Sequence, residues 1–414
     1  MKIIIIGGGF AGLELARKLR RTSFEIVLID RQNHHQFQPL FYQVATAGLE
    51  PSSISFPFRK IFHKATNIDF VLAEVSAILP EKQQVMTDEG AFDYDCLVIA
   101  TGCKTNYFGN EGIAANAFSM KTTQEAIEIR NSILLSFEEV ALRGMDQHNG
   151  LNNIVIVGAG PTGVELAGAF SELKHHVLPR DYPKVDFRQL NIILLEGSKN
   201  TLNALSEEAK IASRKYLEEL GVEVRTEVYV TKYDGEDVSL STGEVLKSRN
   251  VIWAAGVTGN VIQGLKPEAL IRNRYVVNRC NAVTGYENIY ALGDIAYMET
   301  PKYPAAHPQV ANVAIGQARN LAANLQRRQK GESMKEYEYK DLGSMATVGK
   351  HKAVVDLPFI RFQGRLAWFT WMFLHLMLIL NVKNKLIIFI NWAWSYFTND
   401  SSLRLILKPR NKVV

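Results

Sequence analysis

The chain has 414 residues, of which 47% are hydrophobic and 21% are charged. These are the proportions of a globular protein, the length suffices for two or three domains, and no low-complexity tract is present. The formal net charge of +5 comes from the C-terminal tail: eight basic residues and one acidic residue follow position 360, and the remainder carries −2. The basic residues flank apolar runs and no nucleic-acid motif is present, which excludes a nucleic-acid-binding protein.

The three cysteines, Cys96, Cys103 and Cys280, form no CxxC motif and no close pair. This pattern argues against a disulfide framework and fits a reducing compartment. No metal-ligand cluster is present, so we expect no metal and interpret His307 and His375 as structural. The first predicted strand starts at Lys2, so we also expect no signal or transit peptide.

The first predicted unit begins with an apolar strand, residues 3–6, and the motif Gly7-Gly8-Gly9-Phe10-Ala11-Gly12. In such a unit the first glycine permits a tight turn, the second lets the backbone approach a pyrophosphate, and the third lets helix pack on strand. A helix over 11–21 and a strand over 25–30 follow, and Asp30 ends that strand where an acid accepts a hydrogen bond from a ribose hydroxyl. This context favours a dinucleotide site over a purely structural glycine turn.

Two more strands, residues 69–73 and 96–100, continue this unit. The second leads into Ala100-Thr101-Gly102, a turn of small residues that suits close approach of a cofactor.

The second predicted unit repeats the plan with strand 154–157 and the motif Gly158-Ala159-Gly160-Pro161-Thr162-Gly163. A helix from Thr162 towards Leu173, a polar insertion and a strand over 190–195 lead to Glu196. A carboxylate there accepts hydrogen bonds from an adenosine ribose and repels a 2′-phosphate, which favours NAD over NADP. Helix 206–220, strand 223–226 and the segment 251–256, ending in Ala255 and Gly256, complete the unit.

The chain is then predicted to return to the first unit with a strand over 288–292, the pair Gly293-Asp294 and a helix over 308–329. The first unit is thereby the outer domain, in which Asp294 can accept a hydrogen bond from the ribityl chain of a flavin. We therefore predict an α/β protein with two Rossmann-type domains, the second inserted in the first. This order resembles that of the flavoproteins with two dinucleotide-binding domains over about residues 1–330. The resemblance implies an FAD-binding domain of residues 1–115 and 257–330 and an NADH-binding domain of residues 116–256, and residues 331–414 are the predicted C-terminal membrane-anchoring helical region.

Several segments resemble the type II NADH:quinone oxidoreductases, which belong to the flavoproteins with two dinucleotide-binding domains. They are Phe37–Gly48 (FQPLFYQVATAG), Gly163–Gly168 (GVELAG), Trp253–Val257 (WAAGV) and Asn391–Thr398 (NWAWSYFT). The resemblance implies FAD at the first site, NADH at the second and a membrane quinone as acceptor, and members of the family often form homodimers. The sequence shows no set of membrane-spanning helices with buried ionisable groups, so we expect no proton pumping. It also implies that Gln43 and Thr46 contact FAD and that Glu165 is catalytic near the nicotinamide and flavin edge. The alternative for Glu165 is an exposed carboxylate that stabilises the helix dipole.

The family carries an Ala-Gln-x-x-x-Gln motif that lines the quinone pocket. Here the helix places Asn312 and Gly316 where the two glutamines belong. The resemblance thus implies a quinone site that includes Gln309, Ala311, Asn312, Gly316 and Gln317.

Other functions remain open at this point. Disulfide reductases and sulfide:quinone oxidoreductases need paired cysteines near the flavin, which this chain lacks. A soluble NADH oxidase or ferredoxin reductase of the same superfamily is one alternative, and a nucleotide-dependent redox-sensing binding protein is another.

The C-terminal region contains two apolar segments, Leu366–Leu380 and Leu386–Phe397, with Val382–Lys385 between them. Both are shorter than the roughly 20 residues that span a bilayer. We interpret them as a peripheral anchor on the cytoplasmic face of the bacterial inner membrane, against the alternatives of buried core helices or a transmembrane hairpin. The residues expected to meet lipid are Trp368, Trp371, Trp392 and Trp394, with Arg361, Arg365, Lys383, Lys385, Arg404 and Lys408.

Overall fold

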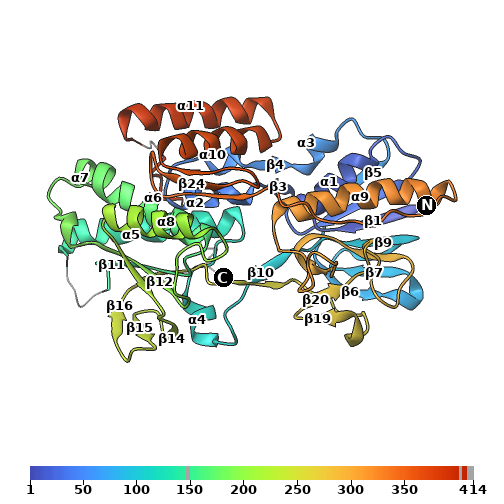
Figure 1. Ribbon diagram of the computed structural model, residues 1–414, viewed down its shortest axis with the longest axis horizontal. Helices are drawn as coiled ribbons and strands as arrows, with labels where there is room; N and C mark the ends of the chain where they lie inside the picture. The colour runs from blue at the N-terminus through green and yellow to red at the C-terminus, as the bar shows by residue number, and fades with distance from the viewer. Residues whose placement is uncertain (146–149, 401–402, 408–414) are drawn as a thin grey trace. The chain divides into compact units, whose positions relative to one another are not determined.

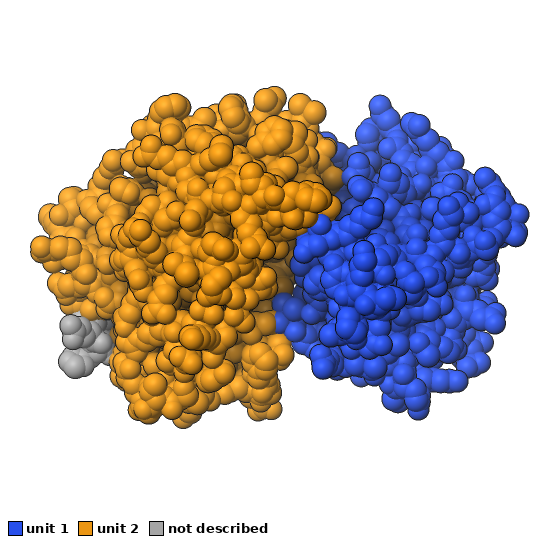
Figure 2. Space-filling model, in the orientation of Figure 1, with its two compact units in different colours: residues 1–36, 56–104, 257–341 blue, residues 37–55, 105–256, 342–414 orange. Residues whose placement is uncertain are grey.

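The structure is a computed structural model, which describes residues 1–145, 150–400 and 403–407. The chain divides into two compact units, each assembled from three stretches (Figures 1 and 2). Unit 1 comprises residues 1–36, 56–104 and 257–341, and unit 2 comprises residues 37–55, 105–256 and 342–414.

Unit 1 is built on a parallel sheet with the strand order β5-β2-β1-β9-β21. The strands are β1 (Lys2–Ile6), β2 (Glu25–Asp30), β5 (Ile68–Leu72), β9 (Cys96–Ile99) and β21 (Ile289–Ala291). The central strand β1 is a run of isoleucines, and Ile3, Ile4 and Ile5 are completely buried. A parallel sheet covered on both faces needs such a continuous apolar run, because neither face meets water.

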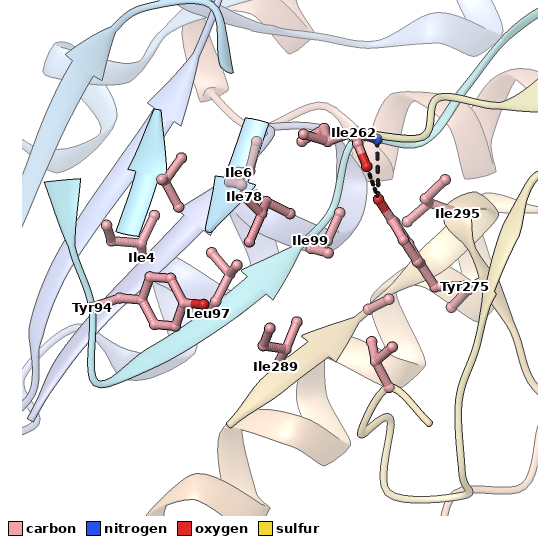
Figure 3. Packing of buried hydrophobic residues seen from close by; sticks show 14 of the residues in the cluster. Ile4, Ile6, Ile78, Tyr94, Leu97, Ile99, Ile262, Tyr275, Ile289 and Ile295 are labelled. Atoms are coloured by element: carbon pink, nitrogen blue, oxygen red, sulfur yellow. Dashed lines mark hydrogen bonds between the residues drawn. The ribbon is translucent and has the colours of Figure 1, made fainter. Parts of the chain in front are cut away.

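Helices α1 (Phe10–Leu19) and α9 (Ala311–Gln329) pack against each other in unit 1. Figure 3 shows part of the core of unit 1, with Ile4 and Leu97 near the Tyr94 ring and Ile295 near the Tyr275 ring. The Tyr275 hydroxyl accepts a hydrogen bond from the Ile262 amide (3.0 Å) and donates one to the Ile262 carbonyl (2.7 Å). The smaller elements of unit 1 include β3 (His34–Gln36), α3 (Phe58–Phe62), β6 (Val75–Leu79), β7 (Gln84–Thr87), β8 (Gly90–Asp93), β18 (Val257–Gly259), β19 (Leu270–Ile271), β20 (Arg274–Val276) and β22 (Ala296–Tyr297).

Unit 2 repeats the parallel plan with the strand order β13-β12-β11-β17. These strands are β11 (Asn153–Val157), β12 (Asn191–Glu196), β13 (Val222–Thr226) and β17 (Asn250–Trp253). Helix α6 (Pro161–Glu172) continues through a π-helical turn, Leu173–Val177, into α7 (Leu178–Asp181). The other elements are α2 (Phe41–Ala45), α4 (Glu111–Asn116), α5 (Thr123–Arg143), α8 (Glu207–Glu219), β14 (Val230–Tyr233), β15 (Asp237–Leu240) and β16 (Val245–Lys247).

The C-terminal part of unit 2 is an antiparallel sheet with two helices. The sheet consists of β23 (Ser344–Thr347), β24 (Ala353–Asp356) and β25 (Arg361–Gln363), and the helices are α10 (Arg365–Leu378) and α11 (Val382–Thr398), which lie side by side (Figure 1). The sheet approaches α6 so closely that a Cβ added to Gly168 would lie 2.3 Å from the Gly349 amide nitrogen. A glycine on α6 therefore permits this contact.

The structure confirms the α/β class and places most predicted strands and helices within two residues of their predicted ends. The predicted linker Val382–Lys385 is wrong, because α11 begins at Val382 and the two helices are joined by residues 379–381. Lysine is a good helix former, so two lysines between apolar runs do not end a helix.

Candidate functional site

The two glycine motifs have the same backbone geometry. Gly7 has φ +98° and Gly158 has φ +101°, a region that favours glycine. A Cβ would lie 2.5 Å from the Ala100 carbonyl oxygen at Gly7, and 2.7 Å from that of Ala254 at Gly158. The first glycine of each motif therefore turns the chain tightly over the next parallel strand, which brings residues 100–102 and 255–256 beside the two turns.

The second and third glycines also match between the motifs. A Cβ on Gly12 or Gly163 would lie 1.8 Å from the carbonyl oxygen of Gly7 or Gly158, so no side chain fits there. A Cβ on Gly9 or Gly160 would meet nothing within 4 Å. The second glycine of each loop thus faces open space that a larger side chain would fill.

Each open space lies at the start of a helix. Helix α1 begins at Phe10, with Ala11 in its first turn, and α6 begins at Pro161, followed by Thr162. Neither helix has a side-chain N-cap hydrogen bond or an acidic residue in its first turn. The backbone amides and the positive end of the helix dipole make such a terminus a binding site for an anion such as a pyrophosphate.

The two acids are also placed alike. Asp30 accepts hydrogen bonds from the amides of Gly8 (2.6 Å) and Gln32 (2.7 Å). Glu196 accepts them from the amides of Ala159 (2.6 Å) and Ser198 (2.8 Å). Each carboxylate thus binds the middle of its glycine loop, and each oxygen keeps an acceptor site for a ribose hydroxyl. The residues of both loops fit a dinucleotide.

Burial raises the pKa of Asp30, and its hydrogen bonds from Gly8 and Gln32 act against that change. The hydrogen bonds from the Gly8 and Gln32 amides therefore fix the position of the carboxylate at the end of β2.

The pair Gly293-Asp294 lies between α1 and α9. The Gly293 amide donates to Oε1 of Gln317 (2.7 Å), and Nε2 of Gln309 donates to the Asp294 carbonyl (3.0 Å). A Cβ on Gly293 would lie 3.5 Å from the Cβ of Ala11, so this turn reaches the first glycine loop. The structure thus brings the predicted FAD residues of unit 1 together.

The predicted quinone residues of α9 differ in accessibility. Gln317 is 0% exposed and offers no surface to a ligand, whereas Ala311 and Asn312 are half-buried. A Cβ on Gly316 would lie 2.1 Å from the Tyr337 hydroxyl oxygen. The departure from the family motif at this position therefore has a packing reason, which is the Tyr337 ring.

Unit 2 contains a cavity with a volume of about 160 Å³. It is lined by α2, α6 with its π-helical turn, the turn after β23, and helices α10 and α11. Gln43, Thr46 and Glu165 line this cavity, and none of the predicted residues on α9 does. Tyr42, Thr347 and Lys350 line it too, and sequence reasoning missed them as site residues.

Glu165 is 8% exposed and lies at the fifth residue of α6, beyond the first turn. The alternative of an exposed carboxylate that stabilises the helix dipole is therefore wrong. Burial raises the pKa of Glu165 to about 8, while the Thr347 backbone and the Trp371 side chain act against that change. This carboxyl carries its proton at neutral pH and can donate it.

A chain of hydrogen bonds runs along the same cavity. The Trp392 indole donates to Oε1 of Gln43 (2.7 Å), whose Nε2 donates to the Tyr42 hydroxyl (2.9 Å). The Tyr42 hydroxyl in turn pairs with the Thr347 hydroxyl (3.0 Å). Tyr42 lies inside the segment that resembles the family, but nothing in the sequence indicates that Thr347 joins it.

Helices α10 and α11 expose one apolar side each, which we call the apolar stripe. Its members are Leu366, Phe369, Phe373, Met377, Leu378, Val382, Leu386, Phe389, Ile390, Trp394 and Phe397, all at least 47% exposed. At 1.5 Å per residue, the 14 residues of α10 and the 17 of α11 extend about 21 and 25 Å. No helix of the described residues is both long and apolar enough to cross a membrane.

Three of the four predicted tryptophan anchors are wrong. Trp368, Trp371 and Trp392 are at most 9% exposed, and only Trp394 faces outward. The Trp371 ring stacks on His375 with 3.9 Å between centroids, and Trp368 packs against the Tyr396 ring. Packing these large rings inward buries more apolar area than placing them at a lipid surface.

The predicted lipid-facing basic residues are also divided. Arg361, Arg365 and Lys383 are exposed, whereas Lys385 is half-buried. Arg404 forms ion pairs with Asp181 and Asp400, so its charge is neutralised by partners within unit 2. Lys408 lies outside the described residues.

In the described part of the chain, no group of three or more His, Cys, Asp or Glu residues could hold a metal ion. No disulfide joins the three cysteines, all of which lie in the described residues, and the Cys103 thiol donates a hydrogen bond to Asp294 (3.1 Å).

Comparisons with known families cover almost the whole chain. Residues 1–318 match the family described as pyridine nucleotide-disulphide oxidoreductase, and residues 342–399 match the NDH2 C-terminal domain.

The chain is similar in sequence to named proteins over most of its length. The chain is 32% identical to the type II NADH:quinone oxidoreductase Ndh of Mycobacterium tuberculosis, over 96% of this chain and 88% of that protein. It is 30% identical to a type II NADH:quinone oxidoreductase of Staphylococcus aureus, over 85% of this chain and 89% of that protein.

Two solved structures share the fold. NDH2 from Plasmodium falciparum in complex with NADH has a TM-score of 0.90 at 21% identity, covering 98% of this chain and 99% of that one. The sulfide:quinone oxidoreductase of Aquifex aeolicus has a TM-score of 0.72 at 21% identity, covering 99% and 96%.

Proposed function

The chain belongs to the type II NADH:quinone oxidoreductase family, and on that premise we propose that it oxidises NADH and reduces a membrane quinone by two electrons through FAD. The observation that carries the proposal is the matched pair of glycine loops. Each loop presents an open second glycine at a helix start, and an acid binds the loop amide beside it.

We assign FAD to the loop of unit 1 and NADH to the loop of unit 2, with the second nucleotide domain inserted in the first. Asp30 and Glu196 then hold the two ribose groups, and Asp294 holds the ribityl chain. When bound, FAD accepts a hydride from NADH and passes two electrons on to the quinone. The protein binds and orients the two nucleotides, and Glu196 selects NADH by repelling a 2′-phosphate.

Glu165 supplies a proton in this proposal. Quinone reduction to the quinol consumes two protons with the two electrons, and the buried Glu165 carboxyl carries its proton at neutral pH. In keeping with the family to which the chain belongs, the reaction does not pump protons.

The quinone residues on α9 act in two ways in this proposal. Asn312 contacts the quinone with its half-buried side chain. Gln317 acts by holding the Gly293 amide, because it has no exposed surface of its own.

The apolar stripe binds the membrane surface. About 25 cal/mol is gained for each square ångström of apolar surface removed from water, so eleven large exposed side chains favour a lipid interface over water. Arg361, Arg365 and Lys383 add attraction to anionic lipid. We place this surface on the cytoplasmic face of the membrane, and a homodimer stays a prediction.

Steady-state NADH consumption by the purified, FAD-loaded protein tests the proposal. A short-chain quinone should support turnover without oxygen, and oxygen alone or ferredoxin should support far less. Turnover with oxygen alone would identify an NADH oxidase, and turnover with ferredoxin alone a ferredoxin reductase. No NADH consumption with any of these acceptors would favour a redox-sensing binding protein.

A further inference from the structure

We propose that the cavity of unit 2 admits protons from solvent to Glu165 along one side of α6, with His176 and Glu172 at its outer end and water between. This inference rests on the proposed function, because it concerns the supply of protons for quinone reduction.

The first observation is that the residues of the proposed path share one side of α6. Glu165, Ala169, Glu172 and His176 are separated by four, three and four residues, so they share one side of α6 and its π-helical turn. All four line the cavity. The three titratable residues become more exposed along the helix: Glu165 is 8% exposed, the Glu172 side chain 22% and the His176 side chain 46%. This series leads from solvent to the buried carboxyl.

The outer end is an ordered pair. Oε2 of Glu172 lies 3.3 Å from Nε2 of His176, and its Oε1 accepts a hydrogen bond from the Lys350 amide (3.1 Å). A histidine and a carboxylate at this distance can exchange a proton.

The nearby Lys350 ammonium is hydrogen-bonded to other groups, so the Glu172–His176 pair can exchange protons. The Lys350 ammonium donates to the Ser395 (2.5 Å) and Tyr396 (2.9 Å) carbonyls and to Asn399, at the end of α11. The other titratable groups near the pair are Asp400 and Tyr396 on the cavity wall and His351, which follows Lys350.

The inner gap is long enough to need water. Seven residues of helix separate Glu165 from Glu172, about 10 Å along the axis. The intervening Ala169 is small and leaves this space open. A cavity of about 160 Å³ has room for several water molecules. Two or three in line bridge the gap, and the Tyr42 and Thr347 hydroxyls offer them hydrogen-bond partners.

The overall reaction consumes one proton from solution, which explains why a proton path is needed. NADH, one proton from solution and quinone yield NAD⁺ and quinol. NADH provides the electron pair and one hydrogen, and the solution provides the other proton. Glu165 must therefore regain from solvent each proton that it gives up.

Blocking the water space tests the path with charges unchanged. In the full-length, FAD-loaded protein, Ala169→Met fills the cavity beside Glu165. Enzyme reduced by NADH without oxygen is mixed rapidly with a short-chain quinone, and flavin reoxidation is followed by absorbance. We expect reoxidation by quinone to slow about tenfold or more, increasingly towards high pH. Reoxidation by ferricyanide, which takes electrons only, should stay unchanged.

A second variant tests the outer end. His176→Asn should slow quinone reoxidation in the same pH-dependent way, and added imidazole should restore the rate. His175→Asn is the matched control, because His175 is in the same turn but does not line the cavity. It should behave as the wild type does.

The outcomes separate this inference from the proposed function. A wild-type protein that quinone cannot reoxidise contradicts the proposed function. Wild-type rates in both Ala169→Met and His176→Asn between about pH 6 and pH 9 overturn the proton path. Equal slowing with quinone and ferricyanide also overturns it, because that result marks a disturbed flavin.

Discussion

The Glu165 carboxyl makes stability depend on pH in a way that Glu165→Gln should remove. Burial raises its pKa in the folded state from the ordinary 4.5 to about 8. The folded protein therefore holds the proton more tightly than the unfolded chain does. Below pH 4.5 both states are protonated and no penalty exists. As the pH rises from 4.5 to 8 the unfolded state gains by ionising, so the free energy of unfolding falls, and above about pH 8 the loss is complete.

The size of this loss follows from the pKa values. A difference of about 3.5 units at 1.36 kcal/mol per unit amounts to about 5 kcal/mol. Glutamine has the same shape and does not ionise. The free energy of unfolding of Glu165→Gln, relative to that of the wild type, should therefore rise by up to about 5 kcal/mol between pH 4.5 and pH 8.

Urea denaturation with saturating FAD, followed by tryptophan fluorescence, measures this difference. All five tryptophans lie in unit 2, so the signal reports the unit that contains Glu165. Glu208→Gln is the control: its side chain is 68% exposed, so water screens its charge and its ion pair with Arg361 (3.7 Å). A difference between Glu165→Gln and wild type that stays constant with pH would refute the argument, because it would mean that Glu165 ionises alike in both states.

Three further predictions concern the nucleotide loops and the apolar stripe. Gly9→Val should give a folded but colourless protein, because the side chain fills the open space at the start of α1; full flavin retention would contradict the assignment. Glu196→Gln should narrow the ratio of kcat/KM for NADH over NADPH by about tenfold or more, since the repulsion of a 2′-phosphate is lost, and an unchanged ratio would remove Glu196 from that role. Phe373→Glu should weaken sedimentation with anionic vesicles by about tenfold or more, whereas Phe108→Glu, at a residue 67% exposed against 61% for Phe373 but outside the stripe, should not; equal losses would argue against a specific surface.

The sequence predicted the parts of the site that depend on local geometry. Gly7, Gly12, Gly158 and Gly163 are required by contacts within one strand–turn–helix unit, so their spacing reveals the unit. The positions of Asp30 and Glu196 follow, because parallel strands end at the same edge of a sheet.

What the sequence did not predict depends on contacts between distant segments. Glu165 is buried by β23, which lies about 180 residues later in the chain, so its neighbours in sequence do not show its burial. The inward packing of Trp368 and Trp371 could not be predicted either, because α10 is apolar on nearly all sides. Gly316 is explained only by Tyr337, which reaches α9 from a later loop.

The central claim is that electrons pass from NADH through one bound flavin to quinone, and two rapid-mixing steps without oxygen test it most directly. Oxidised flavins in general absorb at about 450 nm, and mixing with NADH should bleach this absorbance. Subsequent mixing with quinone should restore it, with one quinone consumed for each flavin. A flavin that NADH bleaches but quinone does not reoxidise, or one that NADH does not bleach, would contradict the account.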